Sequence, residues 1–114
     1  MTESTMPNGT VRFDLQDAVA TVTLDRPETL NSMNDDLMQD LSSALSAIEQ
    51  DENVRVAVIT GAGRGFCSGA DLNNAADSQS DIINVTPAFS ETDFFNPALR
   101  SLHQCPVPTI ARVN

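Results

Sequence analysis

A nearly continuous apolar run at residues 54–60 (VRVAVIT) is the feature that most constrains the fold of this chain. A strand without polar alternation is typical of a parallel sheet that is covered on both faces. Parallel neighbours need a long crossover, and the segment before the run has the pattern of a helix. Apolar residues recur there at helical spacing, at Leu37, Met38, Leu41, Ala44, Leu45 and Ile48. The pattern predicts a strand, helix, strand unit and therefore an α/β fold.

Polar residues predict where this helix begins and which way it faces. Asn34 is a typical N-cap, and Asp35 and Asp36 behind it suit the positive end of the helix dipole. The outward face is expected to carry Gln39, Asp40, Ser42, Ser43, Ser46 and Glu49. The helix is expected to end at residues 51–53.

Shorter patterns complete the outline of a domain at residues 11–114. Apolar and polar residues alternate over 11–16, and Val and Thr are frequent over 18–24, which predicts two strands. Gln16 and Asp17 are expected to form the turn between them. Residues 1–10 show no periodicity, so we expect a flexible N-terminal arm there.

The second half of the chain predicts one more helix and one more strand. Residues 93–104 have helical spacing, with Pro97 tolerable only in the first turn. That helix is expected to pack through Phe94, Phe95, Leu99 and Leu102. Residues 78–92 are polar without a clear period, which predicts a mobile loop, and residues 109–113 predict a last strand.

The charge and composition of the chain exclude several classes of function. Its 16 acidic and 6 basic residues give a formal net charge of -10, and every basic residue is arginine. Without lysine there can be no Schiff base and no Walker lysine, and without a basic stripe we expect no nucleic-acid partner. The sequence has no apolar run of ~18 residues and no signal-peptide pattern, so we expect a cytoplasmic protein with no membrane partner.

Two explanations of the acid excess remain open. A surface this acidic repels itself at low ionic strength, which is typical of a salt-adapted protein. The alternative is a genomic bias that replaces lysine by arginine on an ordinary surface. The two cysteines, Cys67 and Cys105, stand at no metal-binding spacing, so we expect free thiols, no metal site and no cofactor.

Four of the five glycines lie between Gly61 and Gly69, directly after the apolar run. A dinucleotide motif would require glycine at the position of Phe66, and a P-loop would require a lysine, so neither nucleotide motif fits. A glycine loop of this kind can still present backbone N–H groups to an anion or to a developing oxyanion.

Three segments of the chain resemble the enoyl-CoA hydratase/isomerase (crotonase) family. They are residues 20–31 (ATVTLDRPETLN), residues 54–72, which end in GAGRGFCSGADL, and residues 108–114 (PTIARVN). The resemblance covers residues 11–114. It implies a crotonase-like (ClpP/crotonase) spiral of ββα units, here its incomplete N-terminal half, and acyl-CoA thioester substrates. Coenzyme A is then part of the substrate, and the family assembles as homotrimers or hexamers.

The resemblance also implies roles for individual residues. Ala70 supplies a backbone N–H of an oxyanion hole that stabilises a thioester enolate. The coenzyme A path is implied to include Glu28, Thr29, Leu30, Ser68, Ala70, Asp71 and Leu72. Glu28 departs from the basic residue that is frequent there, so Arg26 or Arg64 is expected to compensate for its charge. Asp71 is a candidate N-cap of a following short helix, and an ordinary capped turn at residues 69–71 is the structural alternative.

Other polar residues are expected to have no catalytic role. Cys67 has no base beside it in the sequence, His103 has no nameable partner, and Glu91 and Asp93 match no catalytic glutamate of the family. The family's second oxyanion donor and its glutamates would follow Asn114. We therefore expect a partial enoyl-CoA hydratase or isomerase that is inactive as this chain alone. A non-catalytic CoA-binding or interaction module and a gene remnant are the alternatives.

Overall fold

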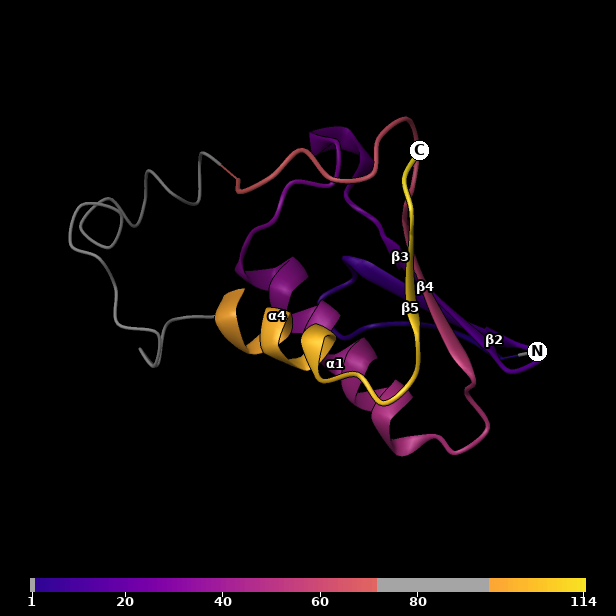
Figure 1. The fold of residues 1–114 in the computed structure, drawn as a ribbon. Helices are drawn as coiled ribbons and strands as arrows, with labels where there is room; N and C mark the ends of the chain where they lie inside the picture. Colours follow the sequence, from indigo (N-terminus) through magenta and orange to yellow (C-terminus); the bar gives the residue numbers. More distant parts are fainter. Residues whose placement is uncertain (1, 72–94) are drawn as a thin grey trace.

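The computed structural model describes residues 2–71 and 95–114, which form one sheet with helices on one side of it (Figure 1). The elements are β1 (Thr2–Thr5), β2 (Val11–Gln16), β3 (Val19–Leu24), the 3-10 helix η1 (Pro27–Thr29), α1 (Asp35–Gln50), β4 (Val56–Gly61), α4 (Phe95–His103) and β5 (Thr109–Arg112). Among the described residues, no helix is long and apolar enough to cross a membrane.

The sheet has its strands in sequence order, from β1 at one edge to β5 at the other. β1, β2 and β3 pair antiparallel, whereas β3 pairs parallel with β4, and β4 with β5. α1 makes the crossover from β3 to β4 and contacts β2, β3 and α4. The predicted strand, helix, strand unit is therefore confirmed.

Helix α1 is held by its cap and by its apolar face. Asn34 Oδ1 accepts a hydrogen bond from Leu37 N at 2.9 Å, which confirms the predicted N-cap. The apolar face of α1 is fully buried against the sheet, where β2, β3 and β4 contribute Val11, Phe13, Ala20, Val22, Leu24, Ala57 and Ile59. Burial of each large apolar side chain contributes about 1.5–3 kcal/mol, so this one contact holds the helix on the sheet.

Asp40 differs from the prediction, because it is buried rather than outward-facing, with 1% of its surface exposed. Its carboxylate accepts hydrogen bonds from Asn8 N at 2.9 Å, Thr10 N at 2.9 Å and Thr10 Oγ1 at 2.6 Å. Helical spacing could not reveal these partners, which lie about 30 residues earlier in the chain. Asp40 thus fixes the loop that leads into β2.

Regular structure begins before Val11, unlike the expected arm at residues 1–10. Strand β1 pairs with β2 from Thr2↔Leu15 to Thr5↔Arg12. The turn after β2 is also one residue later than predicted, because Asp17 and Ala18 have φ values of 51° and 67°. Two left-handed residues in a two-residue loop match the right-handed twist of a hairpin.

Helix α4 packs more weakly than its sequence suggests. Ala98 is its buried residue, whereas Leu99 is 50% exposed, and Pro97 lies in the first turn as predicted. Phe95 and Leu102 are partly buried against the core. The predicted loop at 78–92 and Phe94 lie outside the described residues. β5 confirms the last predicted strand.

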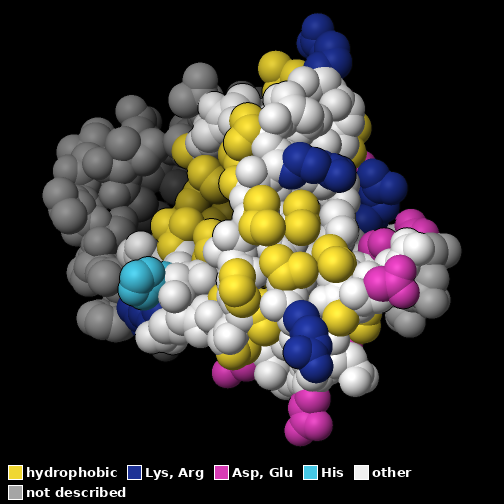
Figure 2. Space-filling view, turned by 45° about the vertical axis from the view of Figure 1, so that its right-hand side comes forward, with side chains coloured by type: hydrophobic (Ala, Val, Ile, Leu, Met, Phe, Trp, Pro, Cys, Tyr) yellow, Lys and Arg dark blue, Asp and Glu magenta, His cyan; other side chains and the backbone are white. Residues whose placement is uncertain are grey.

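The sheet face opposite the helices is uncovered within the described residues. Strand β4 was expected to be buried on both sides, but its Val56 and Val58 are only half-buried, and Ile110 beside Val58 is 53% exposed. Figure 2 shows hydrophobic side chains gathered on this side of the molecule with basic side chains around them. The apolar character of β4 thus reflects two different faces, of which the helices cover one.

Candidate functional site

Asn31 connects the loop after β3 with the glycine segment after β4. It is fully buried, and its Oδ1 accepts a hydrogen bond from Arg26 N at 2.7 Å. Its Nδ2 donates to Ala62 O at 3.0 Å and to Gly65 O at 2.9 Å. Every polar atom of the buried amide is engaged, so the two loops have a fixed spacing.

Asn114 holds the same glycine segment from the end of β5. Its Nδ2 donates to Gly61 O and to Gly63 O, both at 2.9 Å, and its Oδ1 accepts from Gly61 N at 3.4 Å. Gly63 has a φ of 79°, which favours glycine at this turn. The three segments that carry the family resemblance therefore meet at one end of the sheet.

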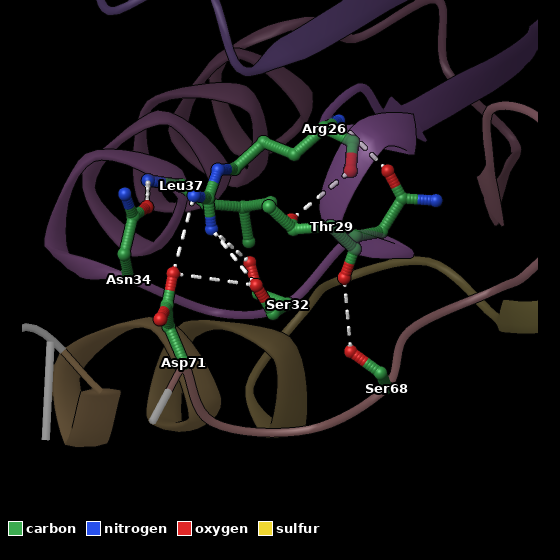
Figure 3. A network of polar contacts seen from close by, with 8 residues as sticks. Arg26, Thr29, Ser32, Asn34, Leu37, Ser68 and Asp71 are labelled. Atoms are coloured by element: carbon green, nitrogen blue, oxygen red, sulfur yellow. Dashed lines mark hydrogen bonds and ion pairs between the residues drawn. The ribbon is translucent and has the colours of Figure 1, made fainter. Parts of the chain in front are cut away.

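Residues 68–71 run beside the loop after β3, residues 25–34, which we call the first loop. Backbone hydrogen bonds join the two segments, and we call the place where they meet the junction. Ser68 N donates to Leu30 O at 3.0 Å, and Met33 N donates to Gly69 O at 2.8 Å. Asp71 N donates to Met33 O at 2.8 Å. Figure 3 shows the side-chain contacts at this junction, including the bond from Ser68 Oγ to Thr29 O at 3.2 Å. Ala70 pairs with Met33 as a single parallel bridge.

The direction of the Ala70 N–H follows from these bonds. A trans peptide is planar, with its C=O and N–H pointing in opposite directions. Because Gly69 C=O points at Met33, the N–H of Ala70 in the same peptide points away from the first loop. Ala70 is exposed, and within residues 2–71 and 95–114 its N–H has no hydrogen-bond partner. The positive φ of Gly69, 109°, makes this turn of the chain possible.

Arg26 and Asp71 form an ion pair beneath this segment, with Arg26 Nη2 at 3.2 Å from Asp71 Oδ2 (Figure 3). Arg26 Nη1 also donates to Ser32 O at 2.6 Å and to Ser32 Oγ at 3.1 Å. The two charged side chains are only 14% and 13% exposed. Arg26 is therefore committed to the protein interior, which leaves the exposed Arg64 as the remaining candidate to compensate for Glu28.

The structure brings together most of the residues expected along the coenzyme A path. Thr29 and Leu30 contact Ser68 through hydrogen bonds, and Leu30 has 39% of its surface exposed. Glu28 is exposed in η1. Leu72 lies outside the described residues, as does any helix that Asp71 was expected to cap. The side-chain partners of Asp71 that are described belong instead to the first loop.

Sequence reasoning missed Asn31, Asn114 and the role of Arg26 at this junction. The sequence did contain a clue to these residues, because each lies inside or at the end of a segment that resembles the family. Only the fold shows that both asparagine amides contact the same loop.

The described part of the chain offers backbone donors rather than a metal centre. Among residues 2–71 and 95–114 no group of three or more His, Cys, Asp or Glu side chains could hold a metal ion. Cys67 and Cys105 are free, half-buried thiols, and His103 is exposed in the last turn of α4. The chemical group that the junction offers to a ligand is the outward-pointing backbone N–H of Ala70, which the hydrogen bonds of the turn hold in place.

Curated proteins similar to this chain include acyl-CoA enzymes from several bacteria. A 1,2-epoxyphenylacetyl-CoA isomerase from Escherichia coli K12 is 42% identical over 102 residues, which cover 88% of this chain and 38% of that protein. A probable enoyl-CoA hydratase from Rhodobacter capsulatus is 35% identical over 105 residues, covering 92% of this chain and 38% of that protein. The chain thus spans about two fifths of the length of these relatives.

Solved structures share the fold. An enoyl-CoA hydratase/carnithine racemase from Magnetospirillum magneticum matches with a TM-score of 0.80 and 26% identity, over 97% of this chain and 40% of that chain. An enoyl-CoA hydratase from Mycobacterium marinum matches with a TM-score of 0.73 and 39% identity, over 91% of this chain and 47% of that chain. The predicted crotonase-type fold is confirmed. Because the model of the enoyl-CoA hydratase/isomerase family also matches residues 14–114, the chain belongs to that family.

Proposed function

We propose that this chain binds an acyl-CoA thioester and presents the Ala70 N–H to its carbonyl oxygen. The observation that carries the proposal is the outward direction of this N–H, which is fixed by the bond between Met33 N and Gly69 O. A donor held in place before the reaction stabilises negative charge on the carbonyl oxygen without reorganisation. In the complete enzyme, this charge develops when the thioester takes on enolate character.

The reaction we propose for the complete enzyme is that of an enoyl-CoA hydratase or isomerase. The two relatives described above are named as an isomerase and a hydratase, and both names contain a CoA thioester. A shared oxyanion donor fits hydration of an enoyl-CoA and migration of its double bond, because both need a stabilised enolate and differ in how protons are then moved.

We propose that coenzyme A lies along Glu28, Thr29, Leu30, Ser68, Asp71 and Leu72. Leu30 and Ser68 are joined by a backbone bond at 3.0 Å, so together they provide one continuous edge next to Ala70. Arg64 is exposed in the glycine segment and is the proposed partner for coenzyme A phosphates near Glu28. The cytoplasmic location and the trimeric or hexameric assembly stay predictions.

The test compares two ligands that differ only at the carbonyl group. Isothermal titration of the chain with butyryl-CoA and with S-butyl-CoA, a thioether, isolates the contribution of a hydrogen bond to the carbonyl oxygen. One such bond is worth ~0.5–1.5 kcal/mol, so butyryl-CoA should bind about three- to tenfold more tightly. Equal affinities would contradict the role of Ala70 and would favour a CoA-binding module.

Two further measurements separate the remaining alternatives. We expect residues 1–114 alone to show no steady hydration of crotonyl-CoA, because none of their acids matches a family glutamate position. Conversion above the buffer rate that disappears in Ala70→Pro would contradict this expectation. A cooperative thermal transition is expected for a folded domain, whereas its absence together with no binding of either ligand would indicate a gene remnant.

A further inference from the structure

Arg26 makes hydrogen bonds through both its backbone and its guanidinium, although compensation for the charge of Glu28 would need only the guanidinium. Its backbone N–H donates to Asn31 Oδ1 at 2.7 Å, and its C=O accepts from Thr29 N at 3.0 Å and from Asn31 N at 2.8 Å. Its guanidinium reaches past this turn to Ser32 and to Asp71. A single residue therefore shapes the first loop and also holds the segment that follows Ala70.

Asp71 is fixed at two points on the far side of Ala70. Its N–H donates to Met33 O at 2.8 Å, and its Oδ2 lies 3.2 Å from Arg26 Nη2 and 3.4 Å from Ser32 Oγ. On the near side, Gly69 O accepts from Met33 N at 2.8 Å. The Gly69–Ala70 peptide, which carries the Ala70 N–H, is held at its own C=O by Met33 N, and the residue after Ala70 is the anchored Asp71. A shift of Asp71 would therefore rotate this peptide about its bond to Met33.

We propose that Arg26 is a positioning residue, which acts through Asp71 and, together with the bond between Met33 N and Gly69 O, holds the direction of the Ala70 N–H. This inference rests on the proposed function of Ala70. The planar guanidinium is suited to the task, because its separate N–H groups reach Ser32 and Asp71 at the same time. Lysine, a single point charge on a flexible stem, lacks that fork.

The chain contains a matched control for this ion pair. Arg12 and Asp25 form a second ion pair, with Arg12 Nε at 3.3 Å from Asp25 Oδ2. Their side chains are 44% and 31% exposed, compared with 14% and 13% for Arg26 and Asp71. Exposed pairs contribute little, so Arg12→Lys and Asp25→Asn should have small effects.

The first measurement is amide hydrogen exchange by NMR on the whole chain, in the wild type, Arg26→Lys, Asp71→Asn and the two control variants. We expect the protection of the Met33 and Asp71 amides to fall about tenfold or more in Arg26→Lys and Asp71→Asn, because charge-assisted bonds are lost. The amides of β3 should keep their protection, and the control variants should leave all of these amides unchanged. A general structural role would lower the protection of β3 as well.

The second measurement is the ratio of the affinities for butyryl-CoA and S-butyl-CoA. Arg26→Lys should remove most of the threefold to tenfold preference for the thioester. The ratio cancels any change in coenzyme A binding that the two ligands share. Unchanged protection of Met33 and Asp71, or protection that falls in step with β3, would overturn the proposal, as would a retained thioester preference. If the wild type itself shows no preference, the proposed function fails, and hydrogen exchange still decides whether Arg26 positions this peptide.

Discussion

Asn31 occupies the space that a side chain at Gly61 would need. A Cβ atom on Gly61 would lie 2.7 Å from Asn31 Nδ2, 2.5 Å from Phe66 O and in still closer contact with Gly65 O. Two of these three atoms belong to the backbone of the glycine segment. The last residue of β4 is therefore glycine because the segment folds back across it, and Asn31 holds the segment in that position.

Gly61→Ala should destabilise the protein strongly. The added methyl group meets backbone oxygens that cannot move away independently, and overpacking of this kind costs ~1–3 kcal/mol or more. Gly65→Ala is the matched control, because a Cβ there would make ordinary contacts with Leu30 at 3.7 Å and 3.8 Å. Thermal melting of both variants checks the prediction, and a similar loss in the two would show that crowding at Gly61 is not the cause.

Asn31→Asp should also be destabilising, although it changes one atom of the side chain. The carboxylate cannot donate to Ala62 O or Gly65 O, and it would be buried facing both carbonyl oxygens. We expect a loss of at least ~2 kcal/mol in the free energy of unfolding. Denaturant unfolding measures this loss. Asn53→Asp, at an exposed residue whose side chain makes no hydrogen bond among the described residues, should change stability by less than ~0.5 kcal/mol.

Ala70→Pro should remove the proposed oxyanion donor while sparing the internal bonds of the junction. Since the Ala70 N–H has no partner within the described residues, proline takes no hydrogen bond from the fold. In a complete enzyme we expect turnover to fall at least ~10²-fold, the loss typical of one donor.

Ala70→Ser keeps the N–H and is the control for Ala70→Pro. We expect it to cost far less in turnover, with the larger side chain acting mainly on KM. Melting curves and CoA affinity must accompany the rates, since proline can also distort the turn. A folded, CoA-binding proline variant with turnover within about threefold of the wild type would contradict the assignment of Ala70.

Salt should raise the melting temperature if the acidic surface is an adaptation to salt. Raising potassium chloride from about 0.1 M to about 2 M shortens the Debye length from ~10 Å to a few Å and screens repulsion within a chain of net charge -10. A parallel series with sulfate separates screening from exclusion of the salt from the protein surface. A melting temperature that stays flat or falls in chloride would leave genomic bias as the explanation.

The sequence by itself determined the elements of this protein and the family to which it belongs. Periodicity located α1 and its Asn34 cap, and the apolar run located β4, because helices and strands impose local periods on where apolar residues stand. The glycine segment and its flanking motifs were sufficient to recognise the family, and the role of Ala70 as an oxyanion donor stays a prediction.

Tertiary structure alone decided how these segments support one another. Asp40 was predicted to face solvent but is buried against Asn8 and Thr10. Arg26 was one of two candidates to compensate for the charge of Glu28 but is paired with Asp71. In both cases the partner lies 30 or more residues away along the chain. A local sequence pattern predicts the face of a helix or strand on which a residue lies. It does not predict which distant residue will contact that side chain, because only folding brings the two together.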